Sequence, residues 1–275
     1  MTIRTDLAAE AVMQAQDISL GGVSTQTVTH AQAALEVQRI HVFTEQAAAA
    51  LGKSVGRYVT VRLTDGMIDA YSEQAKLRTK LIAQEIKALC CGRGGVLVAG
   101  LGNRDITPDA VGPLCADRVF ATRHIGQLAE EIDMSGLSEV SVIQTGVLGK
   151  TGIESSDMVR AVCERVSAST VIAVDALACA ETANLGRTIQ LTDTGISPGS
   201  GVANARRELS KQTLGAECVA VGVPTVIDFG AGGETMMVTP RNIDKLVHNA
   251  AEYIAMAINL ALHPELTYDE LMSLV

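Results

Sequence analysis

Two aspartates in this 275-residue chain stand where carboxylates could do chemistry. Asp109 follows the apolar run of residues 96–99 through a short loop, and Asp175 comes directly after the apolar run of residues 171–174. Such continuous apolar runs are typical of parallel strands buried on both faces. Ligands gather beyond the carboxyl ends of strands in these sheets. If the two strands are neighbours, both carboxylates converge on one cleft.

A pair of neighbouring carboxyls has a defined chemistry. Two acids held close together cannot both ionise easily, so one keeps a proton near neutral pH while the other can accept a proton from water. Such a pair can hydrolyse an amide with an activated water. Asp109 also has a structural explanation, because the helix dipole favours an aspartate in a first turn. Asp175 is harder to explain structurally, since a buried carboxylate is costly unless it is paired.

Other polar positions could contribute to the same cleft. Glu154 and Asp157 could join its rim, although helix capping explains them as well. The Gly/Ser-rich stretch at 193–201 could hold a peptide or an oxyanion through its N–H groups, or be an ordinary surface loop. Arg206 and Arg207 follow it and could receive an acidic side chain, or remain solvated. The residues alone leave these alternatives open.

Several other kinds of site have weak or missing signals. The turn at 100–103 suggests a phosphate cradle, but it lacks the third Gly of a dinucleotide fingerprint and the Gly-Lys-Ser/Thr of a P-loop. The five histidines have no spacing typical of a zinc site. The six cysteines form no CxxC pair and mostly lie in apolar runs, as buried thiols do. Acid–base chemistry by carboxylates is therefore favoured.

Composition and charge argue against some classes of binding partner and indicate a cellular compartment. The net charge is −9, and only 3% of residues are aromatic, none of them Trp, so the chain lacks the footprint for direct binding to nucleic acid. Apolar runs are too short to span a bilayer. Arg4, Asp6 and Glu10 interrupt the start of the chain, where an export signal needs an unbroken apolar stretch. We therefore expect a cytoplasmic protein that does not contact membranes.

Alternating strand and helix patterns predict a single α/β domain with a mostly parallel sheet flanked by helices. Residues 1 to about 40 are polar and weakly patterned, and we expect no core element there. The predicted strands lie at about 55–64, 96–99, 140–144, 171–174, 187–192 and 218–223. The predicted helices lie at about 68–91, 108–122, 155–167 and 240–261.

Short runs spread along most of the chain carry a family resemblance. They are GLGN at 100–103, TPDAVGP at 107–113, TRH at 122–124, TGIESSD at 151–157, IAVDALA at 172–178, DTGISPGSG at 193–201 and GVPTVID at 222–228. Their order along the chain makes the match specific, and the resemblance covers roughly residues 1–265. The chain resembles the germination proteases of spore-forming bacteria, which degrade small acid-soluble spore proteins when the spore germinates.

The resemblance implies an endopeptidase of an atypical aspartic type, made as a zymogen and assembled as a homotetramer. Its catalytic acids fall on Asp109 and Asp175, the same pair that the residues themselves indicate. The implied fold is similar to that of hydrogenase maturation proteases, in which equivalent acids bind nickel together with a His. No His stands near a matching loop of this chain, so we expect no metal and no other cofactor.

The run IRTDLAAE at residues 3–10 looks like the family's self-processing site, with the cut between Asp6 and Leu7. Residues 1–6 would then form a short propeptide. Residues 7–275 would form one peptidase domain, less regular up to residue 50. Before processing, the segment would occupy the cleft as an imitation of substrate and hold the zymogen inactive.

The resemblance also suggests residues that bind substrate. Arg206 matches an Arg of the family and is the candidate for reading the acidic residue before the cut, and Asn103 and Asp157 are further substrate-binding candidates. The family also carries a long extra segment after the position of Asp228, where this chain has only a few residues before its last helix.

Two competing interpretations remain at this point. One is a metal-dependent processing peptidase of the hydrogenase-maturation kind, which would act on a nickel-loaded precursor and ignore spore proteins. The other is a non-catalytic α/β protein that binds a nucleotide at the 100–103 turn, which would show ligand-dependent shifts in melting temperature and no proteolysis.

Overall fold

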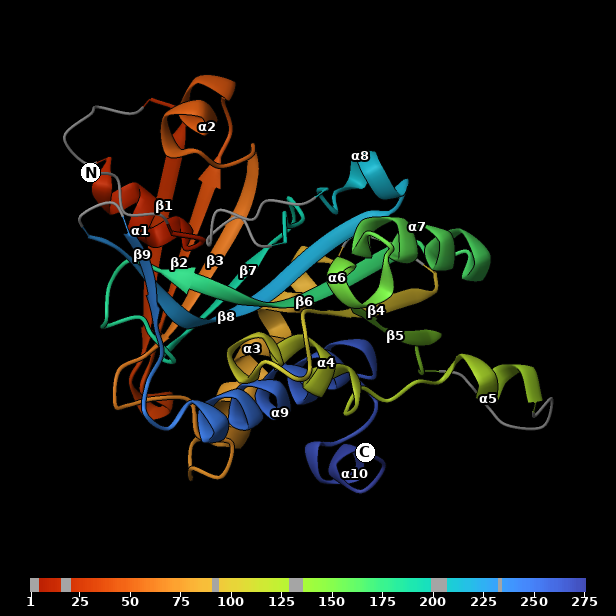
Figure 1. Ribbon diagram of the computed structural model, residues 1–275. Coiled ribbons are helices and arrows are strands. Elements are labelled where there is room, and N and C mark those ends of the chain that lie inside the picture. Colours follow the sequence, from red (N-terminus) through yellow and green to blue (C-terminus); the bar gives the residue numbers. More distant parts are fainter. Residues whose placement is uncertain (1–4, 16–20, 91–93, 129–135, 199–206, 232–233) are drawn as a thin grey trace.

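The computed structural model describes residues 5–15, 21–90, 94–128, 136–198, 207–231 and 234–275 (Figure 1). Its strands are β1 (Val23–His30), β2 (Leu35–Val42), β3 (Gly56–Leu63), β4 (Val96–Leu101), β5 (Val140–Gly146), β6 (Thr170–Cys179), β7 (Thr188–Thr192), β8 (Glu217–Ala231) and β9 (Glu234–Val238). Its helices are α1 (Ala8–Gln14), α2 (Glu45–Leu51), α3 (Ala75–Leu89), α4 (Val111–Ala116), α5 (Arg123–Leu128), α6 (Leu148–Thr151), α7 (Ser155–Val166), α8 (Lys211–Leu214), α9 (Ile243–Leu262) and α10 (Tyr268–Met272), with 3-10 turns η1 (Ala31–Ala33) and η2 (Thr107–Asp109).

The described strands form one nine-stranded sheet in the order β1-β2-β3-β7-β8-β6-β4-β5, and β9 pairs with β8 outside this path. The pairs β4–β5, β4–β6 and β6–β8 are parallel. The pairs β1–β2, β2–β3, β3–β7, β7–β8 and β8–β9 are antiparallel. The prediction of a sheet flanked by helices is confirmed. The expected mostly parallel character holds only for β5, β4, β6 and β8, because the other strand pairs of the described sheet are antiparallel.

The central strands separate two hydrophobic cores. Along β4, Val96 and Val98 pack into the core that contains α3, α4 and α9, whereas Leu97 and Ala99 pack into the core on the opposite face, which contains α7. Figure 1 shows α3, α4 and α9 together below the sheet. Burial of alternate residues on opposite faces explains why this strand reads as an unbroken apolar run.

The expectation that residues 1 to about 40 contain no core element is wrong. The segment forms α1, β1 and β2, and α1 packs with α2 on a small core that includes Ile40, Val42 and Tyr58. β1 has no buried position, because it is an edge strand held by main-chain pairing with β2 over its whole length. Main-chain hydrogen bonds leave no hydrophobic pattern in a sequence, so the strand reads as a polar tail.

Several predicted elements have different bounds. The helix expected at 68–91 begins only at Ala75, and the one expected at 108–122 is the turn η2 followed by the short α4. The strand expected at 171–174 continues to Cys179, so Asp175 lies inside β6 rather than beyond its end. β6 continues because β8 keeps pairing with it on one edge as far as Ile227.

Candidate active site

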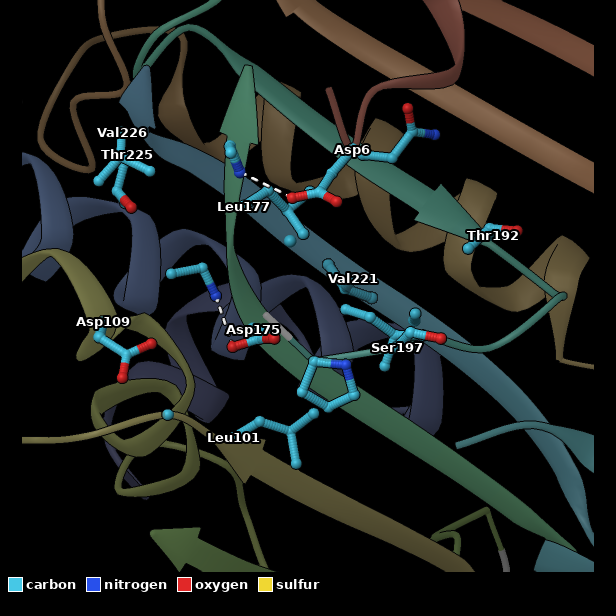
Figure 2. A pocket seen from close by; sticks show the side chains of 18 of the residues that line it. Asp6, Leu101, Asp109, Asp175, Leu177, Thr192, Ser197, Val221, Thr225 and Val226 are labelled. Carbon is cyan, nitrogen blue, oxygen red and sulfur yellow. Dashed lines mark hydrogen bonds between the residues drawn. The ribbon is translucent and has the colours of Figure 1, made fainter. Parts of the chain in front are cut away.

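The candidate site lies at the carboxyl ends of two neighbouring parallel strands, β4 and β6, where β6 extends several residues further than β4. β4 pairs with β6 only as far as Gly100 and Val174, and β6 then runs on. A cavity of about 760 Å³ opens at this step. Asp109 and Asp175 both line it (Figure 2). The two carboxylates that the sequence analysis singled out therefore do share one cleft, because their strands are direct neighbours.

The loop after β4 positions Asp109. The carboxylate oxygen Oδ2 of Asp109 accepts a hydrogen bond of 2.8 Å from the main-chain N–H of Asn103. Gly102 has a φ of +104°, and a Cβ at this position would lie 2.2 Å from the main-chain oxygen of Asp109. The turn therefore requires glycine both for its backbone conformation and for the close approach. The hydroxyl of Thr225 on β8 donates to the carbonyl of Pro108 at 2.7 Å and ties the loop to the sheet.

A second glycine, Gly112, allows α4 to pack closely on the ends of β4 and β6. A Cβ on Gly112 would lie 2.2 Å from the main-chain oxygen of Leu101 and 2.4 Å from that of Val174. Because these atoms belong to β4 and β6, the start of α4 rests directly on both strands. This close packing brings Asp109, two residues before α4, over the step in the sheet.

Asp175 lies at the floor of the cavity. It is only 4% exposed, and its Oδ1 accepts a hydrogen bond of 2.9 Å from the N–H of Ala176. In Figure 2 the side chains of Asp175 and Asp109 lie next to each other across the pocket, and Leu177 lies further along β6. A buried carboxylate that faces a cavity and a second acid has the placement expected of a proton-transfer group.

The other predicted residues divide into three groups. Asn103 and Asp6 line the cavity, and Leu7 next to Asp6 is fully buried. Asp157 does not line it, because its carboxylate in the first turn of α7 pairs with Arg207 at 3.2 Å. Arg206 lies outside the described residues.

The stretch 194–198 of the Gly/Ser-rich loop also lines the cavity, whereas Glu154 does not. The loop packs directly against Leu209. Gly195, with a φ of +86°, lies so close to the main-chain oxygen of Leu209 that a Cβ on residue 195 would be 2.0 Å from that oxygen. The described part of this loop is thus held against the sheet beside the cleft.

Sequence reasoning missed Lys53, which also lines the cavity. Its ammonium donates to the main-chain oxygens of Asp6 at 2.9 Å and of Thr5 at 3.2 Å. Burial lowers the pKa of Lys53, and the charges of Asp6 and Glu10 partly oppose that shift. No motif surrounds Lys53, so only its long-range contacts could have identified it.

Among the residues that the structure describes, no group of three or more His, Cys, Asp and Glu side chains could hold a metal ion. Within the same ranges, no helix has the length and apolar character needed to cross a membrane.

Comparison with known proteins places the chain in a class. The family model described as germination protease matches residues 4–232. Germination protease of Clostridium tetani is 32% identical over 99% of this chain and 99% of its own length. Germination protease of Bacillus cereus strain B4264 is 39% identical over 82% of this chain and 64% of its own length.

The match defines a peptidase whose substrates are proteins. The chain belongs to the germination protease family. Among solved structures, a NiFe hydrogenase maturation protease from Thermococcus kodakarensis matches with a TM-score of 0.38 and 19% identity, over 63% of this chain and 98% of that protein. A likeness at this score carries no information about the chemistry of the site.

Proposed function

We propose that this chain is the endopeptidase that initiates degradation of small acid-soluble spore proteins during spore germination, and that Asp109 and Asp175 activate the attacking water. One observation carries the proposal: Asp175 on β6 and Asp109, in the turn η2 after the neighbouring parallel strand β4, line the same cavity in a chain of the germination protease family. No cofactor enters the proposed reaction.

The pair can divide the work of amide hydrolysis between its two carboxyl groups. The ionised carboxylate takes a proton from water, and the water oxygen forms a bond to the peptide carbonyl carbon. The protonated partner gives its proton to the amide nitrogen as the C–N bond breaks. The products are a carboxylic acid and an amine, and the proton taken from water has replaced the one that was given. The coupled pair, rather than either residue, sets the pH dependence of such a step.

We further propose that the enzyme is made as a zymogen, with residues 1–6 as the propeptide and the cut between Asp6 and Leu7. Two features support this. Asp6 contributes to the wall of the cavity, and its main-chain N–H donates to the carbonyl of Ala178 on β6 at 3.0 Å. A segment docked in this way stands in the path of a substrate. Leu7 is fully buried, so cleavage requires this segment to leave its seat first.

The proposal includes a homotetramer in the cytoplasm of the developing or germinating spore. It also retains Arg206 as the residue that reads the acidic residue before the cut. An Arg206→Ala variant should then lose its preference for Glu or Asp at that position, and unchanged preference would remove Arg206 from the proposal.

The deciding experiment is mass spectrometry of a small acid-soluble spore protein after incubation with the purified chain. Wild type should cut the substrate and acquire Leu7 as its own new N-terminus. Asp109→Asn and Asp175→Asn should each lose about 100-fold or more in rate while remaining folded, as expected for a positioned acid or base. Glu164→Gln on the exposed side of α7 is the matched control and should behave as wild type. Normal cleavage by either aspartate variant would refute its role.

A further inference from the structure

Glu10 in α1 is a buried carboxylate that takes no part in the proposed reaction. It is only 2% exposed. Three of its hydrogen bonds come from the segment that follows β6. The N–H of Ala180 donates to its Oε2 at 2.8 Å, and the N–H of Glu181 and the side-chain amide of Asn184 donate to its Oε1 at 3.0 Å and 2.7 Å. These bonds hold α1 against that segment, because a buried charge is costly unless its donors stay in place.

A further donor to Glu10 lies before the proposed cut. The hydroxyl of Thr5 donates to Oε2 of Glu10, and the same hydroxyl oxygen accepts a hydrogen bond of 3.0 Å from the main-chain N–H of Leu7. A single hydroxyl group therefore connects the Leu7 nitrogen to the Glu10 carboxylate. Because Thr5 belongs to the proposed propeptide, processing would remove this donor from Glu10.

Cleavage between Asp6 and Leu7 would turn the Leu7 nitrogen into a cation. Hydrolysis adds the hydroxyl of water to the carbonyl carbon of Asp6 and a proton to the Leu7 nitrogen as the C–N bond breaks. At neutral pH the new acid then gives its proton to the new amine, because the usual pKa of an α-amino group is about 8. The ammonium has three N–H donors, where the amide had one. A cation is thus created next to a buried carboxylate that has just lost a donor.

Leu7 has contacts that do not depend on residues 1–6. Its side chain is fully buried in a small core with Leu177 of β6 and Ile227 of β8. The following N–H, that of Ala8, donates to Oε1 of the buried Gln190 at 3.0 Å. The new N-terminus can therefore occupy the position that residue 7 has in the uncut chain.

Two other titratable groups lie near this position. The charge of Glu10 acts on Lys53, but the ammonium of Lys53 donates to the main-chain oxygens of Thr5 and Asp6. Cys179 shares the core of Leu7, and burial raises the pKa of this thiol to about 12, so it stays neutral. The Leu7 nitrogen is thus the group best placed to replace Thr5 as a donor to Glu10.

We propose that Glu10 is a binding site for an α-ammonium group, and that the N-terminus created at Leu7 donates to its carboxylate in place of Thr5. The proposal rests on the proposed function, because it takes the cut between Asp6 and Leu7 as given. Loss of residues 1–6 removes Asp6 from the cavity and from Ala178 on β6 (Figure 2). The new ion pair keeps α1 on the segment after β6. Processing thus uncovers the cleft without loosening the wall beside it.

Titration of the Leu7 amine tests this ion pair without catalysis. A ubiquitin-like fusion partner joined to Leu7 and removed by its own specific protease gives the processed chain, whether or not the protein can process itself. Acetylation of the amine by acetic anhydride is followed against pH by mass spectrometry, and the pH of half-maximal rate gives its pKa. A carboxylate in contact should raise this pKa above the usual value of about 8 by about one pH unit or more. A pKa of about 8 or lower, or a processed chain that does not fold, would overturn the site.

Glu10→Gln in the processed chain should bring the pKa of the Leu7 amine back to about 8 or below, because burial and the charge of Lys53 both disfavour the ammonium. Glu45→Gln, at an exposed position of the neighbouring helix α2, is the matched control and should leave the pKa raised. A raised pKa that persists in Glu10→Gln would assign the effect to another group and overturn the site.

Stability against pH provides a measurement that needs no change at Glu10. An amine whose folded pKa is raised contributes stability that is present below its unfolded pKa and lost as the pH rises through the folded pKa. Between pH 7.5 and pH 10, the thermal midpoint should therefore fall further in the processed chain than in the full chain. Both proteins carry Asp175→Asn so that neither is cut, and an equal fall in both would contradict the ion pair.

The N-terminus of the full chain separates this site from the proposed function. If the full chain never acquires Leu7 as its own N-terminus, but the fusion-derived chain has a raised pKa that depends on Glu10, the proposed processing fails and the site stands. If wild type processes itself and cuts spore proteins, but its Leu7 amine titrates near 8, the site fails and the proposed function stands.

Discussion

The parallel half of the sheet, β5, β4, β6 and β8, and the antiparallel half, β1, β2, β3 and β7, meet where β7 pairs with β8. In the parallel half the central strands β4 and β6 are buried on both faces, and all six residues of β4 are buried. In the antiparallel half burial falls toward the edge, until β1 has no buried position.

The two halves also make different contributions to the cleft. The parallel half provides both candidate acids, because the ends of its strands and the loops after them form the floor. The antiparallel half and the helices on it provide Lys53, whose ammonium contacts the main chain of Asp6, whereas β6 of the parallel half holds Asp6 at Ala178. Both candidate acids thus come from one half, so substitutions in the other half should be able to leave the chemistry intact.

The largest effect is expected at Gly112, where α4 rests on the parallel half. In Gly112→Ala, the new Cβ would meet the main-chain oxygens of Leu101 and Val174 below 2.5 Å, so α4 must shift and Asp109 with it. We expect stability to fall by roughly 1–3 kcal/mol from overpacking. A displacement of about 1 Å at the acid can cost about 100-fold in kcat/KM.

The measurement for Gly112→Ala is kcat/KM on a spore protein together with the thermal midpoint. Gly66→Ala is the control, because its added Cβ meets nothing within 4 Å. Full activity in Gly112→Ala would show that the close packing of α4 on β4 and β6 does not position Asp109.

The next effect is expected in the antiparallel half at Arg78 on α3, which is 1% exposed. Its Nε donates to the carbonyl of Ala33 at 2.6 Å, and its Nη2 pairs with Asp65 at 2.5 Å. Arg78→Met leaves the carbonyl without this donor, while Asp65, with a half-exposed side chain, regains solvent. We expect a loss of about 3 kcal/mol in unfolding free energy from the lost donor and the lost packing.

Urea unfolding of Arg78→Met measures this loss, with Lys80→Met on the exposed side of the same helix as the control. Activity per folded molecule should stay at the wild-type level at a temperature where the variant is folded. A large drop in activity there would mean that the two halves are not independent.

A smaller, pH-dependent effect is expected at His263, which is buried and lies edge-on to Phe120 at a centroid distance of 5.4 Å. Burial lowers the pKa of His263, and a backbone contact with Phe120 partly offsets this. A histidine whose folded pKa lies below its unfolded value keeps its full contribution to stability above about pH 6.5. That contribution is lost as pH falls below this value toward the folded pKa.

Thermal midpoints at pH 7.5 and pH 5.0 test whether the contribution of His263 to stability falls as the pH falls. His263→Phe should lose less stability on acidification than wild type, whereas His248→Phe, at an exposed position, should show the wild-type slope. Equal slopes for wild type and His263→Phe would assign the acid sensitivity to other groups.

The smallest effect is expected at the ion pair of Lys76 and Asp269, which joins α3 to α10 at 2.7 Å. Both side chains are largely exposed, and Lys76 also lies 5.5 Å from the ring of Tyr268. Lys76→Ala should cost at most about 0.5 kcal/mol, because solvent screens exposed pairs. Urea unfolding in low and high salt checks this, and a loss comparable to that of Arg78→Met would contradict it.

How far the sequence predicts the fold differs between the two halves. The strands at 96–99 and 171–174 are predicted because burial on both faces produces an apolar run. β1 is missed because its partners are main-chain groups of β2, which any polar sequence can provide. The end of β6 is missed for a related reason, since it depends on how long β8 continues beside it.

By itself, the sequence determined that Asp109 and Asp175 come after apolar runs buried on both faces, because periodicity and composition record local burial. Only the tertiary structure decided that these strands are neighbours, that Asp175 lies inside β6, and that Lys53 meets the main chain of Asp6 across 47 positions of sequence. Such contacts depend on the packing of whole elements and leave no local pattern. The acids could therefore be predicted from their surroundings in the chain, whereas the contacts around them required the fold.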